Sequence, residues 1–505
     1  MHKTLKQILL LSLLGTGSLQ AQTLFTAEAP FKTIFGSRQT VNPYYTGSNP
    51  AFLNCEISDQ LLSVQSAYKT ESGDFRRFID PEQTALFQMS ASGKKSIDSL
   101  QLFKGSFGFQ RIERNGWHWI QTRDYNTLNP FLLGDSTTGK THYNGIVMKA
   151  EYGTMLFSKL LAGFSINYNV DESLKEVFPR PTGDYRDIDL RAGFGYLLNE
   201  NYSAGISARI YDNLEKIKYL EDEGGISQEV FLLKFRGYDY PFVNKKKTEN
   251  RSGFQNGIFT YGDFAYSGSM MKLSAYFGGG IEQLSIKDDA SRPANQGYWQ
   301  NSPYEGALRA AITAANNISL GVAYRLRFDD MWAKHALGSV LLMENKMKHH
   351  EVKTGIEYSV TDKVTLGAEG GFISDEIKYT DYYSPLSWKM KGTAFTASLG
   401  AEIKWNEMLN TFISYGINSF SVSERSLQTG NEGPFFGQSR AADILFMLAE
   451  YIRHSVNSVI SIKPAEWGII NINLAYSTAD PASDSGFRGV KRDNFYSTVE
   501  FRIKA

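Results

Sequence analysis

The chain is poor in cysteine and proline, carries no net charge and has no long apolar run. It contains one cysteine, Cys55, among 505 residues, so no intrachain disulfide can form and a metal or redox site is not expected. Its 53 basic and 53 acidic residues cancel, so no overall field would attract nucleic acid. After Ala21 no stretch of about 18 apolar residues occurs, which argues against membrane-spanning helices. We predict neither a cofactor nor a nucleic-acid partner.

The first residues have the layout of a secretory signal peptide. Lys3 and Lys6 precede a short apolar run from Ile8 to Leu14, and small and polar residues follow as far as Ala21. We therefore expect residues 1–21 to be removed from an exported protein.

Residues 22–80 show little periodicity. Two Asn-Pro steps and a glycine interrupt regular structure between Asn42 and Phe52. The segment could fold into a barrel lumen as a plug, as in fatty-acid channels that carry an Asn-Pro-Ala motif near the N-terminus. A periplasmic arm explains the same composition equally well.

The rest of the chain is rich in glycine, aromatic residues and two-residue alternation. Aromatic residues make up 13% of the sequence, and glycines number 45 against 14 prolines. From about residue 84 apolar side chains recur at every second position, as in Ile188, Leu190 and Ala192, which predicts long strands with one apolar face. Residues 81–505 are therefore predicted to form an all-β, transmembrane antiparallel β-barrel of about 18 strands, within roughly 16 to 20.

Short and long connections alternate along the predicted barrel, as in outer-membrane barrels. The short turns are expected near Asn115-Gly116, Leu198 to Asn201, Asn316-Asn317, Thr361-Asp362 and Trp405 to Glu407. Long polar stretches are expected at about 125–141, 170–185, 212–255, 288–303, 329–349, 376–392, 425–445 and 478–492. We place the short turns in the periplasm and the long loops outside the cell.

A secreted β-sandwich or propeller would also show alternating strands. Against it, the predicted strands run to about 10 to 13 residues rather than the usual 5 or 6. Their apolar faces often end in an aromatic residue, and the opposite faces carry glycine or charge, as in membrane barrels. We therefore favour the barrel.

One segment matches a phosphate-binding motif without its structural context. Gly134 to Thr141 reads G-x-x-x-x-G-K-T, a pattern that binds phosphate only when a helix follows. Here Ile146, Met148 and Ala150 recur at every second position, which predicts a strand instead. We interpret the segment as an exposed loop.

The histidines carry no catalytic signature. His118 lies between Trp117 and Trp119, where an aromatic cluster at the membrane interface is expected. His349 and His350 are interpreted as solvated loop residues, because no further metal-ligand spacing accompanies them. A barrel hydrolase would need a serine or aspartate with a histidine near one rim, and no local motif marks one. We therefore predict no catalytic residue and no enzyme.

Charged residues of both signs fall on the faces expected to point into the lumen. Such side chains can pair across strands, because they cannot face lipid. They can also line a polar path without strong preference for one sign of charge. The lumen-lining candidates are Asp187, Asp189, Arg191, Arg209, Arg325, Arg327, Glu357, Glu369, Glu402, Lys404 and Arg502.

Several short motifs resemble those of a known family. Trp117-His118-Trp119 with Arg123-Asp124-Tyr125, Asn129-Pro130-Phe131 leading to Gly134-Asp135-Ser136, and Pro179-Arg180-Pro181 leading to Asp187-Ile188-Asp189-Leu190 resemble an uncharacterised family of outer-membrane β-barrel proteins from Bacteroidota. The C-terminal Phe501-Arg502-Ile503-Lys504-Ala505 is similar to a barrel-assembly signal, without the terminal aromatic residue of many such signals. The resemblance implies a barrel in the bacterial outer membrane and no particular activity.

These observations support three functional hypotheses. The first is a porin-like channel, or an accessory component, for passage of solutes across the outer membrane. The second is a surface-exposed structural or secretion-associated barrel that binds an unknown protein partner through its long loops, and the third is a barrel hydrolase. In each case the expected partners are the outer-membrane lipid bilayer and the barrel-assembly machinery.

Overall fold

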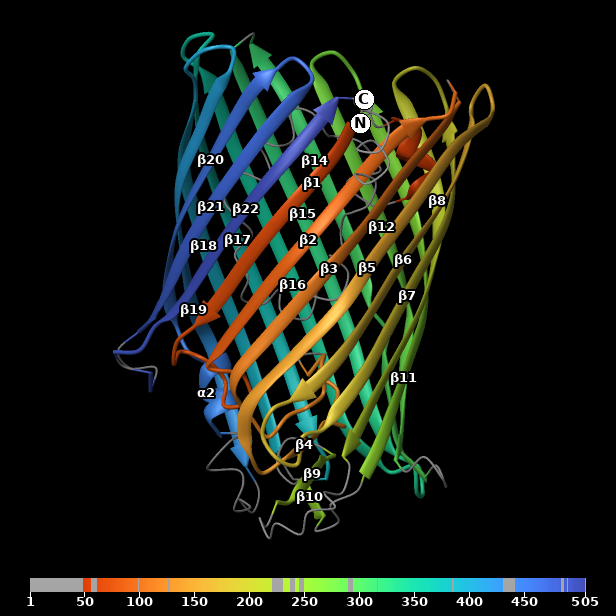
Figure 1. Cartoon of the computed structure of the whole chain (residues 1–505), viewed down its shortest axis with the longest axis vertical. Helices are drawn as coiled ribbons and strands as arrows, with labels where there is room; N and C mark the ends of the chain where they lie inside the picture. The colour runs from red at the N-terminus through yellow and green to blue at the C-terminus, as the bar shows by residue number, and fades with distance from the viewer. Residues whose placement is uncertain are drawn as a thin grey trace, which may run out of the picture.

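The computed structural model describes a β-barrel whose long strands all run from one end to the other (Figure 1). The described residues are 49–55, 61–98, 100–125, 128–219, 230–236, 241–244, 249–288, 294–315, 317–383, 386–429, 441–482, 486–487 and 489–504. The predicted signal peptide, 1–21, and residues 22–48 lie outside them. No helix in the described ranges is long and apolar enough to cross a membrane.

The strands and the two short helical segments have the following bounds. The barrel wall consists of β1 (Leu61–Ser72), β2 (Gln83–Ser96), β3 (Gln101–His118), β5 (Thr138–Phe157), β6 (Leu160–Lys175), β7 (Thr182–Leu197), β8 (Tyr202–Tyr219), β11 (Glu249–Ser267), β12 (Met271–Asp288), β13 (Ala294–Asn301), β14 (Tyr304–Ala315), β15 (Ile318–His335), β16 (Leu341–Ser359), β17 (Val364–Asp381), β18 (Leu386–Lys404), β19 (Leu409–Thr429), β20 (Tyr451–Ala465), β21 (Gly468–Pro481) and β22 (Arg492–Lys504). A separate small sheet contains β4 (Leu133–Asp135), β9 (Leu232–Phe235) and β10 (Pro241–Asn244). The helical segments are η3 (Pro50–Cys55) and α2 (Ala441–Met447).

The wall closes because its first and last strands pair with each other. β1 runs antiparallel to β22, with Gln65 opposite Glu500, and β1 also pairs with β2. β13 and β14 share one position, because both pair with β12 and with β15. The result is a closed antiparallel barrel of 18 strands, which confirms the predicted fold class and strand number.

The two-residue alternation places opposite kinds of side chain on the two faces of the wall. Phe194, Ile206 and Phe395 are 53%, 66% and 61% exposed on the outer face. Glu151 and Asp189, on the inner face, are 3% and 4% exposed. An outer face of apolar side chains around a charged interior is typical of a membrane barrel.

Every connection at one end of the barrel is short, and all of the longest connections lie at the other end (Figure 1). We call these the tight-turn end and the long-loop end. The turns predicted at Leu198 to Asn201, Thr361-Asp362 and Trp405 to Glu407 connect consecutive strands, as does the turn at Asn317, whose neighbour Asn316 lies outside the described residues.

The turn predicted at Asn115-Gly116 is wrong. Both residues belong to β3, where the register with β5 shifts between Arg114 and Trp117. Gly116 has a φ of +60°, a conformation that favours glycine. The Asn-Gly pair therefore marks a bulge inside a strand, which sequence alone does not distinguish from a hairpin.

The long loops are shorter than predicted, because the strands continue past the apolar band. β6 extends to Lys175 and β7 begins at Thr182, inside the stretch expected to be a loop. At this end the outer face carries ion pairs between neighbouring strands, such as Arg186 with Asp212 at 2.6 Å. Both faces are polar there, so the alternation that identifies a strand disappears from the sequence.

The barrel also begins earlier than residue 81, the predicted boundary. β1 lies within the segment expected to be irregular, and its full length pairs with β2 and β22. Its polar residues Ser63, Gln65 and Lys69 alternate with less polar ones, but the apolar face contains Leu62, Val64 and only small or amphipathic side chains after them. Because this alternation is weak, the sequence pattern does not predict β1 as a strand.

Candidate functional site in the lumen

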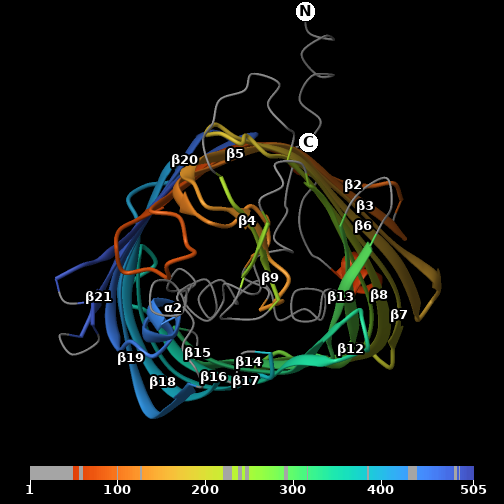
Figure 2. The same ribbon diagram turned by 90° about the horizontal axis from the view of Figure 1, so that it is seen from below.

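Several connections at the long-loop end fold inward and fill that end of the lumen (Figure 2). We call the described parts of residues 73–82 and 119–137, together with β9, β10 and α2, the inner cap. Seen from below, β4, β9 and α2 lie inside the ring of wall strands. The inner cap packs through three apolar clusters, one of which joins Phe75 and Ile444 of the cap to Trp299, Met343 and other wall residues.

Buried ion pairs attach the inner cap to the wall. The Asp135 carboxylate of β4 accepts hydrogen bonds from the Lys175 ammonium at 2.7 Å and the Tyr219 hydroxyl at 3.2 Å. On the neighbouring wall, Asp288 pairs with Arg251 at 2.7 Å and with the cap residue Lys234 at 2.9 Å. Asp135 and Asp288 are 1% and 3% exposed, so these pairs are shielded from solvent.

Two interpretations of this region from sequence are wrong. Gly134 and Asp135 of the phosphate-motif segment are buried in the inner cap rather than exposed, and β5 follows them as predicted. Trp117 does not face the membrane interface, because it is 1% exposed and its indole N–H donates to the Ile79 carbonyl inside the barrel. His118, beside it, contacts Thr138 and stacks on Phe78.

The N-terminal segment Asn49–Cys55 docks on the inner wall near the tight-turn end. The Asn49 amide donates to Asp263 at 2.9 Å and to the carbonyl of Ile206 at 3.3 Å. Phe52 and Leu53 are fully buried against β5, β6 and β7. This part of the predicted segment therefore lies in the lumen, as the plug hypothesis requires, and residues 1–48 lie outside the described ranges.

Three glycines of the wall, Gly163, Gly193 and Gly205, lie directly against this segment, and we call them the glycine floor. A Cβ at Gly163 would lie 2.2 Å from the Pro50 carbonyl, and one at Gly193 would lie 2.0 Å from the Asn49 side-chain oxygen. At Gly205 the nearest contact would be 2.7 Å from the Phe52 ring. These separations leave no room for a side chain, so the wall is built for close approach of the segment.

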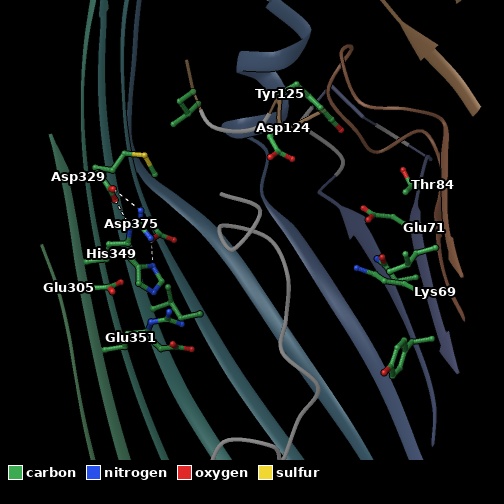
Figure 3. A pocket seen from close by; sticks show the side chains of 18 of the residues that line it. Lys69, Glu71, Thr84, Asp124, Tyr125, Glu305, Asp329, His349, Glu351 and Asp375 are labelled. Carbon is green, nitrogen blue, oxygen red and sulfur yellow. Dashed lines mark hydrogen bonds and ion pairs between the residues drawn. The ribbon is translucent and has the colours of Figure 1, made fainter. Parts of the chain in front are cut away.

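Between the cap and the tight-turn end lies a cavity of about 1120 Å³. Figure 3 shows Asp329, His349, Glu351 and Asp375 on one side of it. The described residues that line it carry 15 Lys or Arg and 12 Asp or Glu. Most of these charges are paired within the wall, for example Asp375 with His349 at 2.7 Å.

The eleven lumen-lining candidates divide into two groups. Seven of them line the cavity, namely Asp187, Asp189, Arg191, Arg209, Arg325, Arg327 and Glu369. The remaining four, Glu357, Glu402, Lys404 and Arg502, belong to the tight-turn ends of their strands and are not among its described lining residues. Within the first group Asp189 accepts from Arg209 at 2.9 Å, so cross-strand pairing and lining of the lumen occur together.

The loop between β1 and β2 holds a further ion pair beside the cavity. Arg77 donates to Asp80 at 2.7 Å, and the Tyr125 hydroxyl donates to the same carboxylate at 3.1 Å. Burial by itself would raise the pKa of the Asp80 carboxyl, but the charges of Arg77 and Arg492 hold that pKa below its ordinary value. Burial and the Asp80 charge raise the pKa of the Tyr125 hydroxyl, which keeps it protonated as a donor.

Sequence reasoning missed the residues that attach the cap and the N-terminal segment. Asp135 and Asp288 carry no recognisable spacing relative to Lys175 and Arg251, because their contacts join distant parts of the chain. The histidine pair was also misplaced. His349 and His350 belong to β16, where His349 lines the cavity and His350 contacts Tyr324.

The chain is similar to several solved structures at low identity. It matches the Ralstonia pickettii toluene transporter TbuX at 9% identity, over 92% of this chain and 93% of that one, with a TM-score of 0.31. The ferric citrate transporter FecA in the unliganded form matches at 10% identity, over 88% and 79%, with a TM-score of 0.47. The CymD monoaromatic hydrocarbon channel matches at 10% identity, over 90% and 91%, with a TM-score of 0.30.

No curated protein matches the chain. The profile of a protein family, described as "Family of unknown function (DUF6850)", matches residues 50–502. The match covers the docked N-terminal segment and nearly the whole barrel wall. The chain therefore belongs to the family of unknown function DUF6850.

Proposed function

We propose that the protein is an outer-membrane barrel through which solutes pass when the inner cap moves. The observation that carries this proposal is the polar cavity, which lies between an end filled by the inner cap and an end where the N-terminal segment is docked. A purely structural barrel has no need of a large charged cavity in its interior. In this proposal the membrane is that of a bacterium, in line with the resemblance to a Bacteroidota family.

The outer surface supports a position in the membrane. Apolar side chains remain exposed down to the turns of the tight-turn end, where Phe157 is 72%, Trp405 57% and Trp467 56% exposed. Aromatic residues at such a boundary are typical of membrane interfaces. The charged outer faces near the long-loop end would project into water, so we place the long-loop end outside the cell and the tight-turn end in the periplasm.

The passage requires movement of the cap, because apolar clusters and buried ion pairs fill that end of the lumen. Asp288 is the most informative position, because it pairs with a wall cation and a cap cation together. Removing one partner of a buried ion pair costs about 3–5 kcal/mol. Such a loss is enough to shift the equilibrium between the closed and open cap by more than tenfold.

The experiment compares Asp288→Asn with the unaltered protein in planar lipid bilayers containing potassium chloride. We expect the substitution to raise the open probability by at least tenfold. Asp330→Asn is the matched control, because Asp330 forms an ion pair with Lys346 in which both side chains are more than half exposed. If Asp288→Asn folds, as judged by heat-dependent migration on gels, and conducts no more than the control, the gating proposal is wrong.

A further inference from the structure

The cavity lining includes an apolar patch at the inner cap. Leu128, Met347, Ile373 and Phe446 line the cavity from four separate elements and pack against one apolar cluster, beside charged cap residues such as Arg77 and Asp80. We call these four residues the roof. All four remain only partly buried although they pack against the larger apolar cluster. Apolar side chains left open to an interior cavity mark a surface that an apolar ligand can cover.

Charged residues follow toward the tight-turn end on β15, the strand that pairs with β16 of the roof. Along β15, Met331 beside the roof is followed toward the tight-turn end by Asp329, Arg327 and Arg325, all of which line the cavity. Figure 3 shows Asp329 with His349 and Asp375 of the neighbouring strands on this side of the cavity. Arg325 makes no ion pair within the part of the chain that the structure describes, and the described lining has three more basic than acidic residues, 15 against 12.

We propose that the cavity binds an amphipathic organic anion, with its apolar body against the roof and its carboxylate toward Arg325. The proposal rests on the proposed function and adds the class of solute to it. Residues along a strand advance about 3.3 Å each, so the four steps from Met331 to Arg327 span about 13 Å. An extended apolar body of about ten carbon atoms covers that distance, and Arg325 follows on the same face of β15. Met347 can adapt to different shapes, because its thioether chain is flexible.

The test measures binding by titration calorimetry in purified protein, with 6-phenylhexanoate as the probe and 6-phenylhexan-1-ol as its neutral counterpart. We expect Arg325→Gln to weaken binding of the anion at least tenfold and to leave binding of the alcohol within twofold. Ile373→Asn, in the roof, should weaken both compounds at least tenfold. Lys404→Gln is the charge-matched control, because Lys404 is not among the described lining residues, and should change neither.

If Arg325→Gln weakens binding of the anion and of the alcohol equally, the assignment of the carboxylate to Arg325 is wrong. The same holds if the unaltered protein binds 6-phenylhexylammonium as tightly as the anion. Absence of saturable binding by the unaltered, folded protein would overturn the proposal as a whole. All three results leave the outcome of the conductance experiment on Asp288 unaffected, because that experiment uses only potassium chloride. Failure of the ligand class and failure of the gated passage are therefore distinguishable.

Discussion

Individual residues in the inner cap carry buried charges that would be costly without a partner of opposite charge. Asp80 is an example, because its carboxylate accepts hydrogen bonds from Arg77 and from the Tyr125 hydroxyl. A carboxyl whose pKa is lowered by folding stabilises the protein at pH values above its ordinary pKa, and this contribution is lost as the pH falls through the lowered value. The ordinary value for aspartate is about 3.9.

We predict that Asp80→Asn lowers the free energy of unfolding by about 1–3 kcal/mol near pH 7. The difference from the unaltered protein should shrink once the pH falls below about 4. Thermal unfolding followed by circular dichroism between pH 3 and pH 7 measures it. Asp212→Asn, at an exposed ion pair with Arg186, is the control and should change little at any pH. A constant difference across the range would contradict the assigned direction of the pKa.

The docked segment Asn49–Cys55 is held by close packing against the wall as well as by hydrogen bonds. The glycine floor permits contacts that any side chain would prevent, and Asn49 adds its hydrogen bond to Asp263. Burial also raises the pKa of the Cys55 thiol to about 11, so this thiol should react slowly while the segment is docked. Cys55 is the only cysteine of the chain, which makes it a direct reporter of docking.

Gly163→Val should displace the segment, because the new Cβ would meet the Pro50 carbonyl at 2.2 Å. We expect labelling of Cys55 by a small maleimide to accelerate at least tenfold in the folded protein. Gly262→Val is the matched control, because a Cβ at Gly262 has nothing within 4 Å. Equal labelling rates for both variants would show that the segment is not held by the glycine floor.

The whole molecule depends on the difference between the apolar outer face and the polar inner face of the barrel wall. Phe395 and Thr396 are neighbours on β18, yet Phe395 is 61% exposed on the outer face and Thr396 lines the cavity. An arginine on the lipid face near the bilayer centre costs about 2–4 kcal/mol, whereas the lumen tolerates charge. Arginine substitutions at these two positions therefore distinguish a membrane barrel from a water-soluble one.

We predict that Phe395→Arg reduces the folded fraction in phosphatidylcholine vesicles severalfold and that Thr396→Arg leaves it nearly unchanged. Heat-dependent migration on gels measures the folded fraction. The same two variants compared in detergent-free buffer provide the control. If Phe395→Arg inserts as well as Thr396→Arg, the apolar outer face does not contact lipid.

Much of this architecture follows from local patterns in the sequence. Alternation at every second position, as in Ile188 and Leu190 with Asp187 and Asp189 between them, determines which faces are apolar and how many strands close the barrel. It also placed seven of the eleven lumen-lining candidates at the cavity. These features are local, because a strand sets the direction of each side chain by its position alone.

The tertiary structure alone decided what fills the lumen. Asn49 meets Asp263, Lys175 meets Asp135, and Arg251 meets the backbone of Phe131, across separations of 214, 40 and 120 residues. No local period records such contacts, because they arise when closure of the wall brings distant strands around one interior. The same closure turns apolar residues inward at the long-loop end, where a pattern of alternation cannot tell lipid from the packed inner cap.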